Sequence, residues 1–504
     1  MVRLKVAVAV TAGALAGGLA VPSAASADTA QVVYAWGYNN WGQAGADPNV
    51  AGSDLLSPVP VHGAAANVTQ LSGPNGPYKG RYVLSLRSDG TVWGWGRNYI
   101  GVLGDVSVST FAPVQIQGLP PNIVQISAGG IHAAALAADG SVWTWGGNNA
   151  GQLGYPTPGA QYSTVPHQVP GVSGVKQVSA GGEFTVALRS NGEVWTWGRN
   201  DHGQLGDGTH TDRTTPARNQ AGYGMTQVSA GGYYALARRA GSVWAWGAND
   251  SGQLGNGSTV ADSATPVIVD RRTQNATQLV AGYTHAFAVD PDGSLWAWGA
   301  NNNGELGLGT AGPAVRTPAK VPGLTGVTQL AAAAEISMAL RSDGTLLVWG
   351  YEGFGLRGDG IPRSTPLSVP TPVTPMPGVT KIALSGSTVL VRAPAVTMPN
   401  VVGALRVSAV AQLQAIGLSV QVTTVPDQPI CNNVGTVESQ TPPPGTVVAP
   451  GGSATIRVYA PPRVAVSDRC VNQGRHRPAR TSRDGAGSLG AERSWCLASV
   501  KEDF

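Results

Sequence analysis

The dipeptide Trp-Gly occurs seven times at steps of about fifty residues, and this repeat limits the fold more than any other feature of the chain. Each copy ends a short apolar stretch and is followed by a turn rich in Asn and Gly. A repeat of this length, with turn residues at fixed offsets, is typical of propellers and solenoids. The tryptophans are Trp36, Trp95, Trp145, Trp197, Trp246, Trp298 and Trp349.

One repeat unit, which begins at Gly174, shows what each copy builds. It holds three short stretches that are mostly apolar, the turn Asn191-Gly192, a Gly-Gln-Leu-Gly loop and a final Thr-Pro segment. This order predicts four short antiparallel strands, which make one blade of a β-propeller. The Asn-Gly pair predicts a two-residue turn with positive φ at both positions.

Five of the Trp-Gly tryptophans are preceded by a second tryptophan two residues earlier, as in Trp195 and Trp197. Residues two apart in a strand point to the same face. Because each indole can bury a large apolar area, we expect both members of each pair in the core between blades.

The two ends of the repeat region look like complementary halves of one blade. The region begins with Val33–Gly37, a strand of the third type without the two that precede it elsewhere. It ends with residues 379–386 and 388–392, which are the first two types without a third. Each strand type then occurs seven times. We therefore predict an all-β, seven-bladed propeller over residues 28–394, in which the N-terminal strand completes the last blade and removes open sheet edges.

Residues 1–27 differ from the repeats and are typical of a secretory signal peptide. Arg3 and Lys5 precede an apolar run, and Ala25-Ser26-Ala27 forms a cleavage motif. A membrane anchor is the alternative, but the run is short and rich in Gly for crossing a bilayer. We therefore expect a secreted protein, extracellular or associated with the cell wall, with no membrane span in the mature chain.

The charge distribution argues against nucleic acid as a partner. The formal net charge of the chain is +4, yet residues 28–394 carry nearly equal numbers of basic and acidic side chains. A near-neutral ring lacks the positive patch that phosphate binding needs.

Signatures of catalysis and of metal binding are missing as well. The histidines are scattered, and no nucleophile stands beside a base in a recognisable pattern. One loop is both polar and compact, but it has no fixed ligand spacing, which favours a solvated loop over a metal site. Its residues are Asp201, His202, Asp207, His210 and Asp212. We therefore expect a protein that is not an enzyme and has no catalytic residues, no metal and no cofactor.

The repeats resemble those of the regulator-of-chromosome-condensation family, because Ala-Gly-Gly, Asp-Gly, Trp-x-Trp-Gly and Gly-Gln-Leu-Gly follow one another in register. The resemblance covers about residues 31–392. The family includes a nucleotide-exchange factor for a small GTPase and secreted bacterial propellers that inhibit β-lactamase. Guanine-nucleotide exchange is thus one alternative function, although an exported chain would not meet cytosolic GTPases, and β-lactamase inhibition is another. The fold does not decide between them.

Residues 395–462 form a second unit. A helical period through Ala409, Leu413 and Gly417 is followed by three strand-like stretches. Together with Pro-x-Val-x-Gly and Gly-x-Val-x-x-Gln-x-Pro, this order resembles a PASTA domain, a small α+β module. The resemblance implies association with peptidoglycan, and a packing spacer is the alternative. Residues 463–504 have no apolar period, so disorder is predicted, and an altered reading frame would look the same.

The chain has three cysteines, all outside the ring: Cys431, Cys470 and Cys496. An oxidising compartment would allow one disulfide, for which three pairings exist. A Cys431–Cys470 disulfide would clip the small module, and it is the pairing that we favour.

Residues that vary at a fixed repeat position are the candidates for ligand binding. Just before the Gly-Gln-Leu-Gly loop, the repeats place Trp41, Ile100, Ala150, His202, Ser251, Asn303 and Phe354. Once the ring closes, Trp41, Ile100 and Phe354 fall on neighbouring blades. Further aromatic residues flank them, namely Tyr38, Tyr99 and Tyr351. We predict that these residues and His202 bind a protein or glycan partner of a non-catalytic binding protein. Local packing, or docking of the C-terminal module, is the alternative.

Overall fold

The computed structural model describes residues 31–51, 53–64, 67–76, 81–104, 108–373, 376–426, 434–449 and 451–460. The expected signal peptide, the 463–504 tail and all three cysteines lie outside these ranges. The Cys431–Cys470 pairing therefore stays a prediction.

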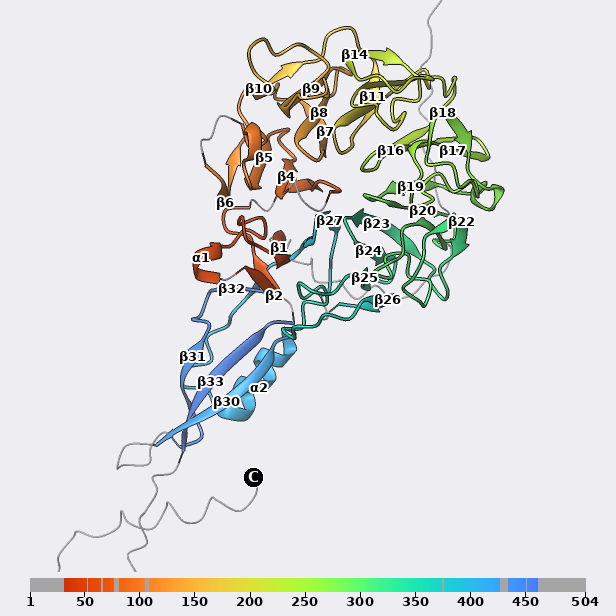
Figure 1. Cartoon of the computed structure of the whole chain (residues 1–504). Helices are drawn as coiled ribbons and strands as arrows, with labels where there is room; N and C mark the ends of the chain where they lie inside the picture. The colour runs from red at the N-terminus through yellow and green to blue at the C-terminus, as the bar shows by residue number, and fades with distance from the viewer. Residues whose placement is uncertain are drawn as a thin grey trace, which may run out of the picture.

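Seven four-stranded antiparallel sheets stand around a ring (Figure 1). The innermost strand of each sheet contacts the innermost strands of the two flanking sheets, and the circle closes between β27 and β3. This is the predicted all-β, seven-bladed propeller. Blade 7 joins the two ends of the repeat region, in the order β27 (Lys381–Ser385), β28 (Thr388–Pro394), β1 (Gln31–Tyr38) and β2 (Asp54–Pro60).

The other six blades are built from consecutive strands, each running from the innermost strand outward. In chain order they are blade 1, β3 (Val68–Ser72), β4 (Tyr82–Arg87), β5 (Val92–Gly96) and β6 (Thr110–Gln115); blade 2, β7 (Ile123–Ala128), β8 (His132–Ala137), β9 (Val142–Gly147) and β10 (Tyr162–Gln168); blade 3, β11 (Val175–Ala180), β12 (Phe184–Arg189), β13 (Val194–Gly198) and β14 (Arg213–Arg218); blade 4, β15 (Gln227–Ala230), β16 (Tyr234–Arg239), β17 (Ser242–Ala248) and β18 (Asp262–Ile268); blade 5, β19 (Gln278–Ala281), β20 (His285–Val289), β21 (Leu295–Gly299) and β22 (Val315–Lys320); blade 6, β23 (Val327–Ala333), β24 (Ile336–Arg341), β25 (Leu346–Gly350) and β26 (Leu367–Pro372). Short helices α1 (Pro48–Ala51), η1 (Tyr99–Gly101) and η2 (Arg271–Thr273) lie in connections.

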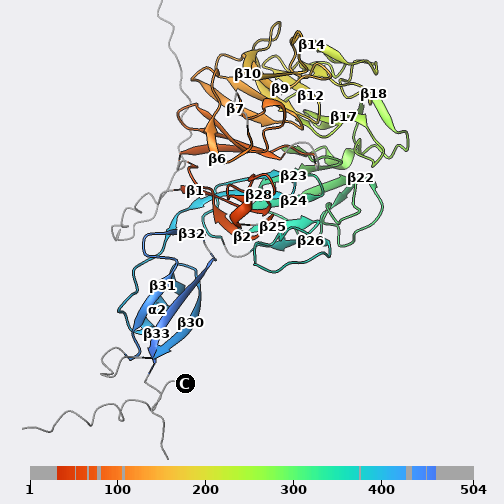
Figure 2. The same cartoon turned by 60° about the vertical axis from the view of Figure 1, so that its left-hand side comes forward.

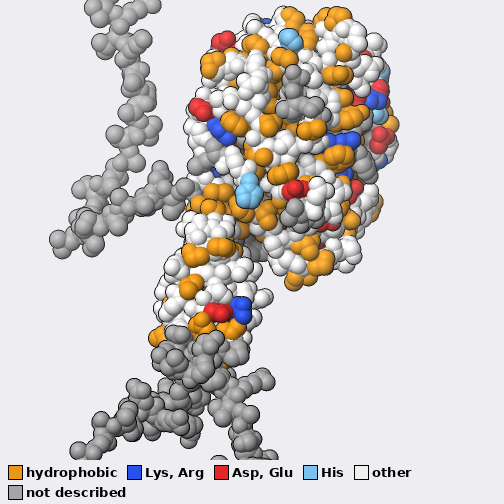
Figure 3. All heavy atoms as spheres, turned by 90° about the vertical axis from the view of Figure 1, so that its left-hand side faces the viewer, with side chains coloured by type: hydrophobic (Ala, Val, Ile, Leu, Met, Phe, Trp, Pro, Cys, Tyr) orange, Lys and Arg blue, Asp and Glu red, His pale blue; other side chains and the backbone are white. Residues whose placement is uncertain are grey.

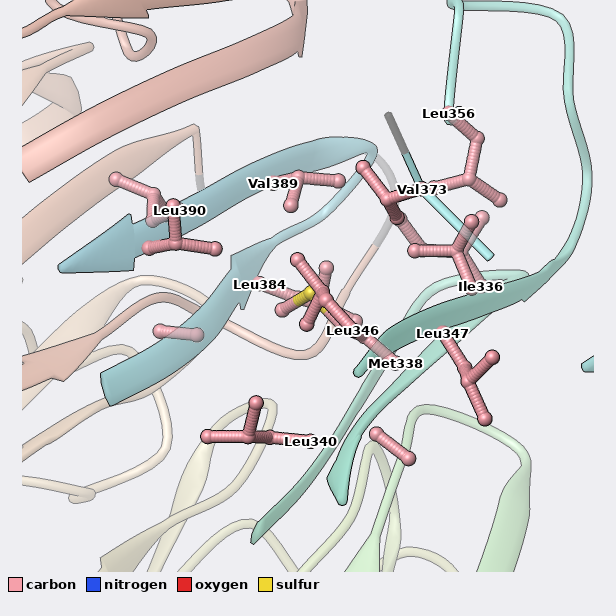
Figure 4. Close-up of a cluster of buried hydrophobic side chains, with 14 of the residues drawn as sticks. Ile336, Met338, Leu340, Leu346, Leu347, Leu356, Val373, Leu384, Val389 and Leu390 are labelled. Atoms are coloured by element: carbon pink, nitrogen blue, oxygen red, sulfur yellow. The ribbon is translucent and has the colours of Figure 1, made fainter. Parts of the chain in front are cut away.

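The predicted closure by the N-terminal strand is confirmed. β1 pairs with β28 without a break, from Gln31 opposite Pro394 to Gly37 opposite Thr388. Apolar side chains of β24 and β25 meet those of β27 and β28 in one buried cluster, with Leu356 reaching in from a loop (Figure 4). Blade 7 is therefore joined to blade 6 by packing as well as completed by strand pairing.

Each Trp-Gly tryptophan fastens its blade to the preceding one. All seven indoles are fully buried, and each donates its N–H to a backbone carbonyl of the preceding blade at 2.8–2.9 Å. The acceptors occupy the Gln position of the Gly-Gln-Leu-Gly loop or its equivalent: Leu356, Gln43, Val102, Gln152, Gln204, Gln253 and Glu305. One residue thus supplies both apolar burial and a directional contact between blades.

The first tryptophan of each pair does not share this burial, so the expectation that both are core residues was wrong in part. Trp93, Trp143, Trp195, Trp244 and Trp296 are only partly buried. Arginine side chains cover several of them, as Arg87 does over Trp93 at 3.6 Å from the ring centroid. The first tryptophan stands farther from the loop end of its strand, and in blades 1, 3 and 4 an amphipathic arginine side chain covers part of its ring.

Glutamine side chains link the inner strands of neighbouring blades, because each amide bonds to both backbone groups of one residue in the next blade. Gln125 accepts a hydrogen bond from the Val178 N–H and donates one to the Val178 carbonyl, at 3.0 and 3.1 Å. Gln70, Gln177 and Gln227 do the same to the next blade. Because neighbouring inner strands are not paired as a sheet, these amides satisfy backbone groups that would otherwise lack partners.

The Asp-Gly and Asn-Gly turns differ from the prediction. Gly192 has a φ of +83°, whereas Asn191 is not among the residues with positive φ. The Asn191 side chain instead accepts a hydrogen bond from the Glu193 N–H at 3.0 Å. The four-residue connection from Ser190 to Glu193 needs the left-handed conformation only at its glycine, because Asn191 closes a local side-chain turn.

Blade 1 has an extra segment that reaches across the ring. Its β3–β4 connection is longer than the equivalent ones, such as that between Ala128 and His132. In the described part of the connection, the Asn75 amide donates to the Ala230 carbonyl at 2.9 Å and to the Ala281 carbonyl at 3.3 Å. The Asn75 carbonyl also accepts from the Ala334 N–H at 2.5 Å. One loop of blade 1 thus contacts blades 4, 5 and 6 at their inner strands.

In its described residues, the C-terminal module contains the helix α2 (Arg406–Ala415) and five strands. They are β29 (Val396–Thr397), β30 (Ser419–Pro426), β31 (Val437–Thr441), β32 (Val447–Val448) and β33 (Ser453–Ala460). Ala409 and Leu413 face its core, and Gly417 follows the helix with a φ of +81°. In the part of the chain that the structure describes, no helix combines the length and the apolarity of a bilayer span.

The module packs against blade 7 at the end of the ring where β28 finishes (Figure 2), and it joins the ring without a gap in the space-filling view (Figure 3). The Tyr34 hydroxyl donates to the Val448 carbonyl at 2.9 Å, and Ala449 belongs to the buried cluster of the propeller. Strand β1 then runs from this contact towards Tyr38. The module and the loops after Trp-Gly are therefore at opposite ends of β1, whose eight residues span about 23 Å.

Candidate functional site

The candidate residues lie on the end of the ring that carries the loops after Trp-Gly, here called the upper face. In each blade, the residue after Trp-Gly donates its backbone N–H to the residue that precedes the second strand. Examples are Tyr38 to Ser387, Arg97 to Arg81, and Tyr351 to Glu335, at 2.7–3.2 Å. These backbone bonds place two variable positions of every blade next to each other on the upper face; in blade 2 one of the two is Gly147.

Three predicted aromatic residues form a continuous row across blades 6 and 7. The ring centroids of Tyr351 and Phe354 are 5.5 Å apart, and those of Phe354 and Tyr38 are 5.2 Å apart, both in edge-to-face geometry. The guanidinium of Arg81 lies 3.9 Å above the Tyr38 ring. All four side chains are partly exposed, so the row is a surface feature rather than core.

A second group continues the row into blade 1. The Arg97 guanidinium lies 4.5 Å from the ring centroid of Trp41 and 5.0 Å from that of Tyr99. Trp41 is 39 % exposed and Tyr99 is 43 % exposed. The backbone bond from Arg97 to Arg81 links this group to the first one. We call the residues Tyr38, Trp41, Arg81, Arg97, Tyr99, Tyr351 and Phe354 the aromatic–arginine patch.

Two predicted site residues lie outside this patch. Ile100 has a φ of +52°, which is rare for a β-branched residue, and its side chain is turned to Gly147 of blade 2. His202 belongs to blade 3, where its ring lies 5.5 Å from that of Tyr233. The shared repeat position therefore gives neighbouring side chains only where consecutive blades carry large ones.

The two arginines were missing from the predicted site. Arg81 precedes the second strand of blade 1 and Arg97 directly follows Trp95-Gly96. These are the two positions that the backbone bond joins in every blade. Comparing the repeats at these positions, as well as before Gly-Gln-Leu-Gly, would have found them.

The polar loop of blade 3 divides its acids among separate partners. Asp207 forms an ion pair with Arg213 at 2.8 Å, and the Asp212 carboxylate accepts from the Asn200 N–H at 2.8 Å. His210 faces Asp262 at 3.2 Å. No group of three or more His, Cys, Asp or Glu side chains converges as a metal site anywhere in the described residues.

Two histidines that share a repeat position are buried between blades. The Thr185 hydroxyl donates to the Gln152 carbonyl, so it accepts from His132 Nε2, at 2.9 Å for both contacts. His285 meets Ser337 in the same way at 3.0 Å. Burial lowers the pKa of His132 to about 4 and that of His285 to about 3. These neutral histidines fasten blades, and no substrate could reach them.

The lowered pKa of His132 predicts a loss of stability in acid. Between pH 6.5 and pH 4 the unfolded chain binds a proton at this residue that the folded chain does not, so stability falls as the pH falls. Phe occupies the same position in blade 3 as Phe184. We subtract the free energy of unfolding of His132→Phe from that of the wild type. This difference should decrease by roughly 2–3 kcal/mol between pH 7 and pH 4, because the variant has no imidazole to protonate. Urea unfolding at both values measures it.

A difference in unfolding free energy between the wild type and His132→Phe that is the same at pH 7 and pH 4 would show that the buried imidazole is not the source of the acid sensitivity.

The fold and the upper face together define a class of protein, a seven-bladed propeller that presents variable side chains on one face of a repeated scaffold. The model of the RCC1-like domain family matches residues 110–394, and the PASTA domain model matches residues 396–460. Since the first match covers more than half of the chain, this protein belongs to the RCC1-like domain family and carries a C-terminal PASTA domain.

Two curated relatives show how far the likeness extends. The ultraviolet-B receptor UVR8 of Arabidopsis thaliana is 30% identical over 287 residues, which cover 55% of this chain and 62% of that protein. The E3 ubiquitin-protein ligase HERC2 of Homo sapiens is 30% identical over 302 residues, covering 55% of this chain and 6% of that protein. The chain thus spans less than two thirds of either relative.

Solved structures agree on the fold. Human WBSCR16 superposes with a TM-score of 0.63 at 24% identity, covering 72% of this chain and 99% of that one. Yeast RCC1 (Prp20), in its structure bound to Kap60, superposes with a TM-score of 0.65 at 20% identity, covering 77% of this chain and 92% of that one. The propeller with its PASTA domain supports a binding or regulatory role.

Proposed function

We propose that this chain is a secreted, non-catalytic binding protein that captures a partner through the aromatic–arginine patch. In this proposal residues 1–27 direct export, residues 28–394 form the propeller, residues 395–462 associate with peptidoglycan, and residues 463–504 are a tail. The observation that carries the proposal is the pair of groups of partly exposed rings and guanidinium groups over three consecutive blades, which the backbone bond from Arg97 to Arg81 links.

The patch has the composition of a binding hot spot. Trp, Tyr and Arg are enriched among the residues that dominate the energetics of protein interfaces. Trp and Tyr bury a large area at a small cost in side-chain entropy, and Arg presents several N–H donors in a fixed geometry. The edge-to-face contacts of Phe354 with Tyr38 and Tyr351 hold these rings in place before any partner arrives. A surface held in its binding geometry loses less freedom on association.

The alternative roles of these rings are less well supported. The C-terminal module packs at the other end of β1, against Tyr34, and so does not cover the patch. Local packing would bury the rings, whereas Trp41 and Tyr99 stay about two fifths exposed. Yeast RCC1 bound to Kap60 is one instance of this fold in a protein complex.

A pull-down with the full-length chain tests the proposal. The bait is incubated with secreted proteins and with purified cell wall from the organism that carries the gene. We expect Trp41→Ala and Phe354→Ala each to reduce capture at least tenfold, because a truncated hot-spot residue costs about 2 kcal/mol. Tyr162→Ala removes a similarly exposed ring, 45% exposed on the outer strand of blade 2, and should leave capture unchanged.

Full capture by both patch variants would refute the assignment of the binding site. Retention by cell wall alone, unchanged in both variants, would support the role proposed for the PASTA domain but would reject the patch.

A further inference from the structure

Two blades carry an arginine at the same repeat position, directly after Trp-Gly: Arg97 in blade 1 and Arg199 in blade 3. In blade 3 this arginine is neutralised by the chain itself. Arg199 contacts the Glu183 carboxylate at 3.0 Å and the Asp201 carboxylate at 2.6 Å. Glu183 precedes the second strand of the blade, and Asp201 lies two residues after the arginine.

Blade 1 has the arginine without the two acids. The position of Glu183 is held by Arg81, and the position of Asp201 is held by Tyr99. Over the ranges that the structure describes, no acidic side chain forms an ion pair with Arg97. The repeat thus offers an internal comparison, in which Arg199 has two carboxylate partners and Arg97 has none among the described residues.

The rings around Arg97 hold its guanidinium in an orientation that suits the binding of an anion. Trp41 and Tyr99 contact the guanidinium through their faces, at 4.5 and 5.0 Å from the ring centroids. A guanidinium bound in this way keeps the N–H groups along its edge, which form paired hydrogen bonds with a carboxylate. Its side chain is already ordered, so less entropy is lost when the bond forms.

We propose that the aromatic–arginine patch binds an acidic segment of a partner protein, with Arg97 taking an Asp or Glu carboxylate as Arg199 takes Glu183 and Asp201. The rings of Trp41 and Phe354 then pack on the apolar side chains of that segment. This inference rests on the proposed function and specifies the chemistry of its partner.

A neutral glycan fits the same surface less well. Sugars bind aromatic side chains by stacking on a ring face, and here guanidinium groups cover such faces of Tyr38, Trp41 and Tyr99. Phe354 is in edge-to-face contact with two other rings. A sugar would have to compete with a guanidinium for these ring faces, whereas the N–H groups of Arg97 suit a carboxylate.

The test uses a random decapeptide library selected on the full-length chain. We expect the enriched peptides to be rich in Asp and Glu, and to lose affinity as salt rises towards 0.5 M, because exposed charges are screened over a few ångströms.

A selected peptide with Gln and Asn in place of its acids should bind about tenfold more weakly. Arg97→Gln should weaken the acidic peptide by a similar factor. Arg189→Gln is the control. It removes an arginine that also lies over a tryptophan, Trp195 of blade 3, and should leave the affinity for the acidic peptide unchanged.

A graft of the blade 3 acids supplies the second variant. Arg81→Glu combined with Tyr99→Asp rebuilds the surroundings of Arg199 around Arg97. We expect this double variant to stay folded, with the far-ultraviolet circular dichroism spectrum of the wild type, and to lose binding of the acidic peptide at least tenfold, since the carboxylates now come from the chain itself. Retained binding in this variant would overturn the inference.

The outcomes separate the two proposals. Enrichment of neutral or basic peptides, no enrichment, or equal binding of the acidic and the amide peptide overturns the acidic partner. Competition only by a tetramer of N-acetylglucosamine assigns the patch to a glycan instead. Trp41→Ala and Phe354→Ala could abolish capture while the selected peptides show no preference for Asp and Glu. In that case the patch remains the binding site, and only the acidic chemistry inferred for its partner is wrong.

Discussion

Replacing Trp36 with Ala should lower the free energy of unfolding by about 4 kcal/mol, the range seen when a large buried side chain is truncated. Trp36 is fully buried in the one blade that joins the two ends of the repeat region. Its indole N–H donates to the Leu356 carbonyl of blade 6 at 2.9 Å. The substitution therefore leaves a cavity and an unsatisfied carbonyl at the closure. Urea unfolding followed by far-ultraviolet circular dichroism measures the change.

Two variants divide this effect into its parts. Trp36→Phe keeps most of the apolar volume and loses the hydrogen bond, so it should cost about 1–3 kcal/mol. Trp93→Ala removes a tryptophan that is only partly buried and should cost less than Trp36→Ala. Equal costs for Trp36→Ala and Trp93→Ala would show that the closure is no more sensitive than the rim of a blade.

Replacing Gly198 with Ala should destabilise the protein by more than about 3 kcal/mol, because a left-handed backbone and a backbone clash act at one residue. All seven glycines of the Trp-Gly pairs have φ between +93° and +108°. At Gly198, an added Cβ would stand 2.7 Å from the Glu183 carbonyl oxygen and 2.7 Å from the Phe184 Cα. Neither is the end of a flexible side chain, so the strands themselves would have to separate.

Gly241 is the matched control for this substitution. Its φ is +68°, and an added Cβ meets no atom within 4 Å. Gly241→Ala should therefore cost only the backbone term, about 1 kcal/mol. Thermal unfolding of the two variants compares them directly. Similar losses would mean that the close approach of the strands plays no part in requiring glycine after tryptophan.

The number of blades could be predicted from the sequence because it equals the number of copies of each strand type. Each strand type carries a local signature, and seven copies of each can pair fully only if the first strand joins the last two. The turn type and the burial of Trp93 could not be predicted in the same way. Both depend on which atoms stand opposite, such as the Arg87 guanidinium over the Trp93 ring.

The candidate site was predictable only in part, for a related reason. A shared repeat position places a side chain at the same height in each blade, which located Trp41 and Phe354 on the upper face. It does not say which neighbours touch. Phe354 meets Tyr38 of the next blade, whereas His202 meets Tyr233 of blade 4. Arg97 could be identified as a site residue only from the structure, because its backbone hydrogen bond to Arg81 shows that these two repeat positions are neighbours on the upper face.

By itself, the sequence determined the repeated unit, the closure of the ring and the kind of module that follows it, because strand length, turn glycines and apolar period are local properties. Only the tertiary structure decided what the upper face presents. Contacts between blades join residues far apart in the chain, as Tyr351 and Tyr38 are joined through Phe354. Side-chain chemistry at such contacts depends on the neighbour across the gap, and that neighbour is set by the packing of the ring.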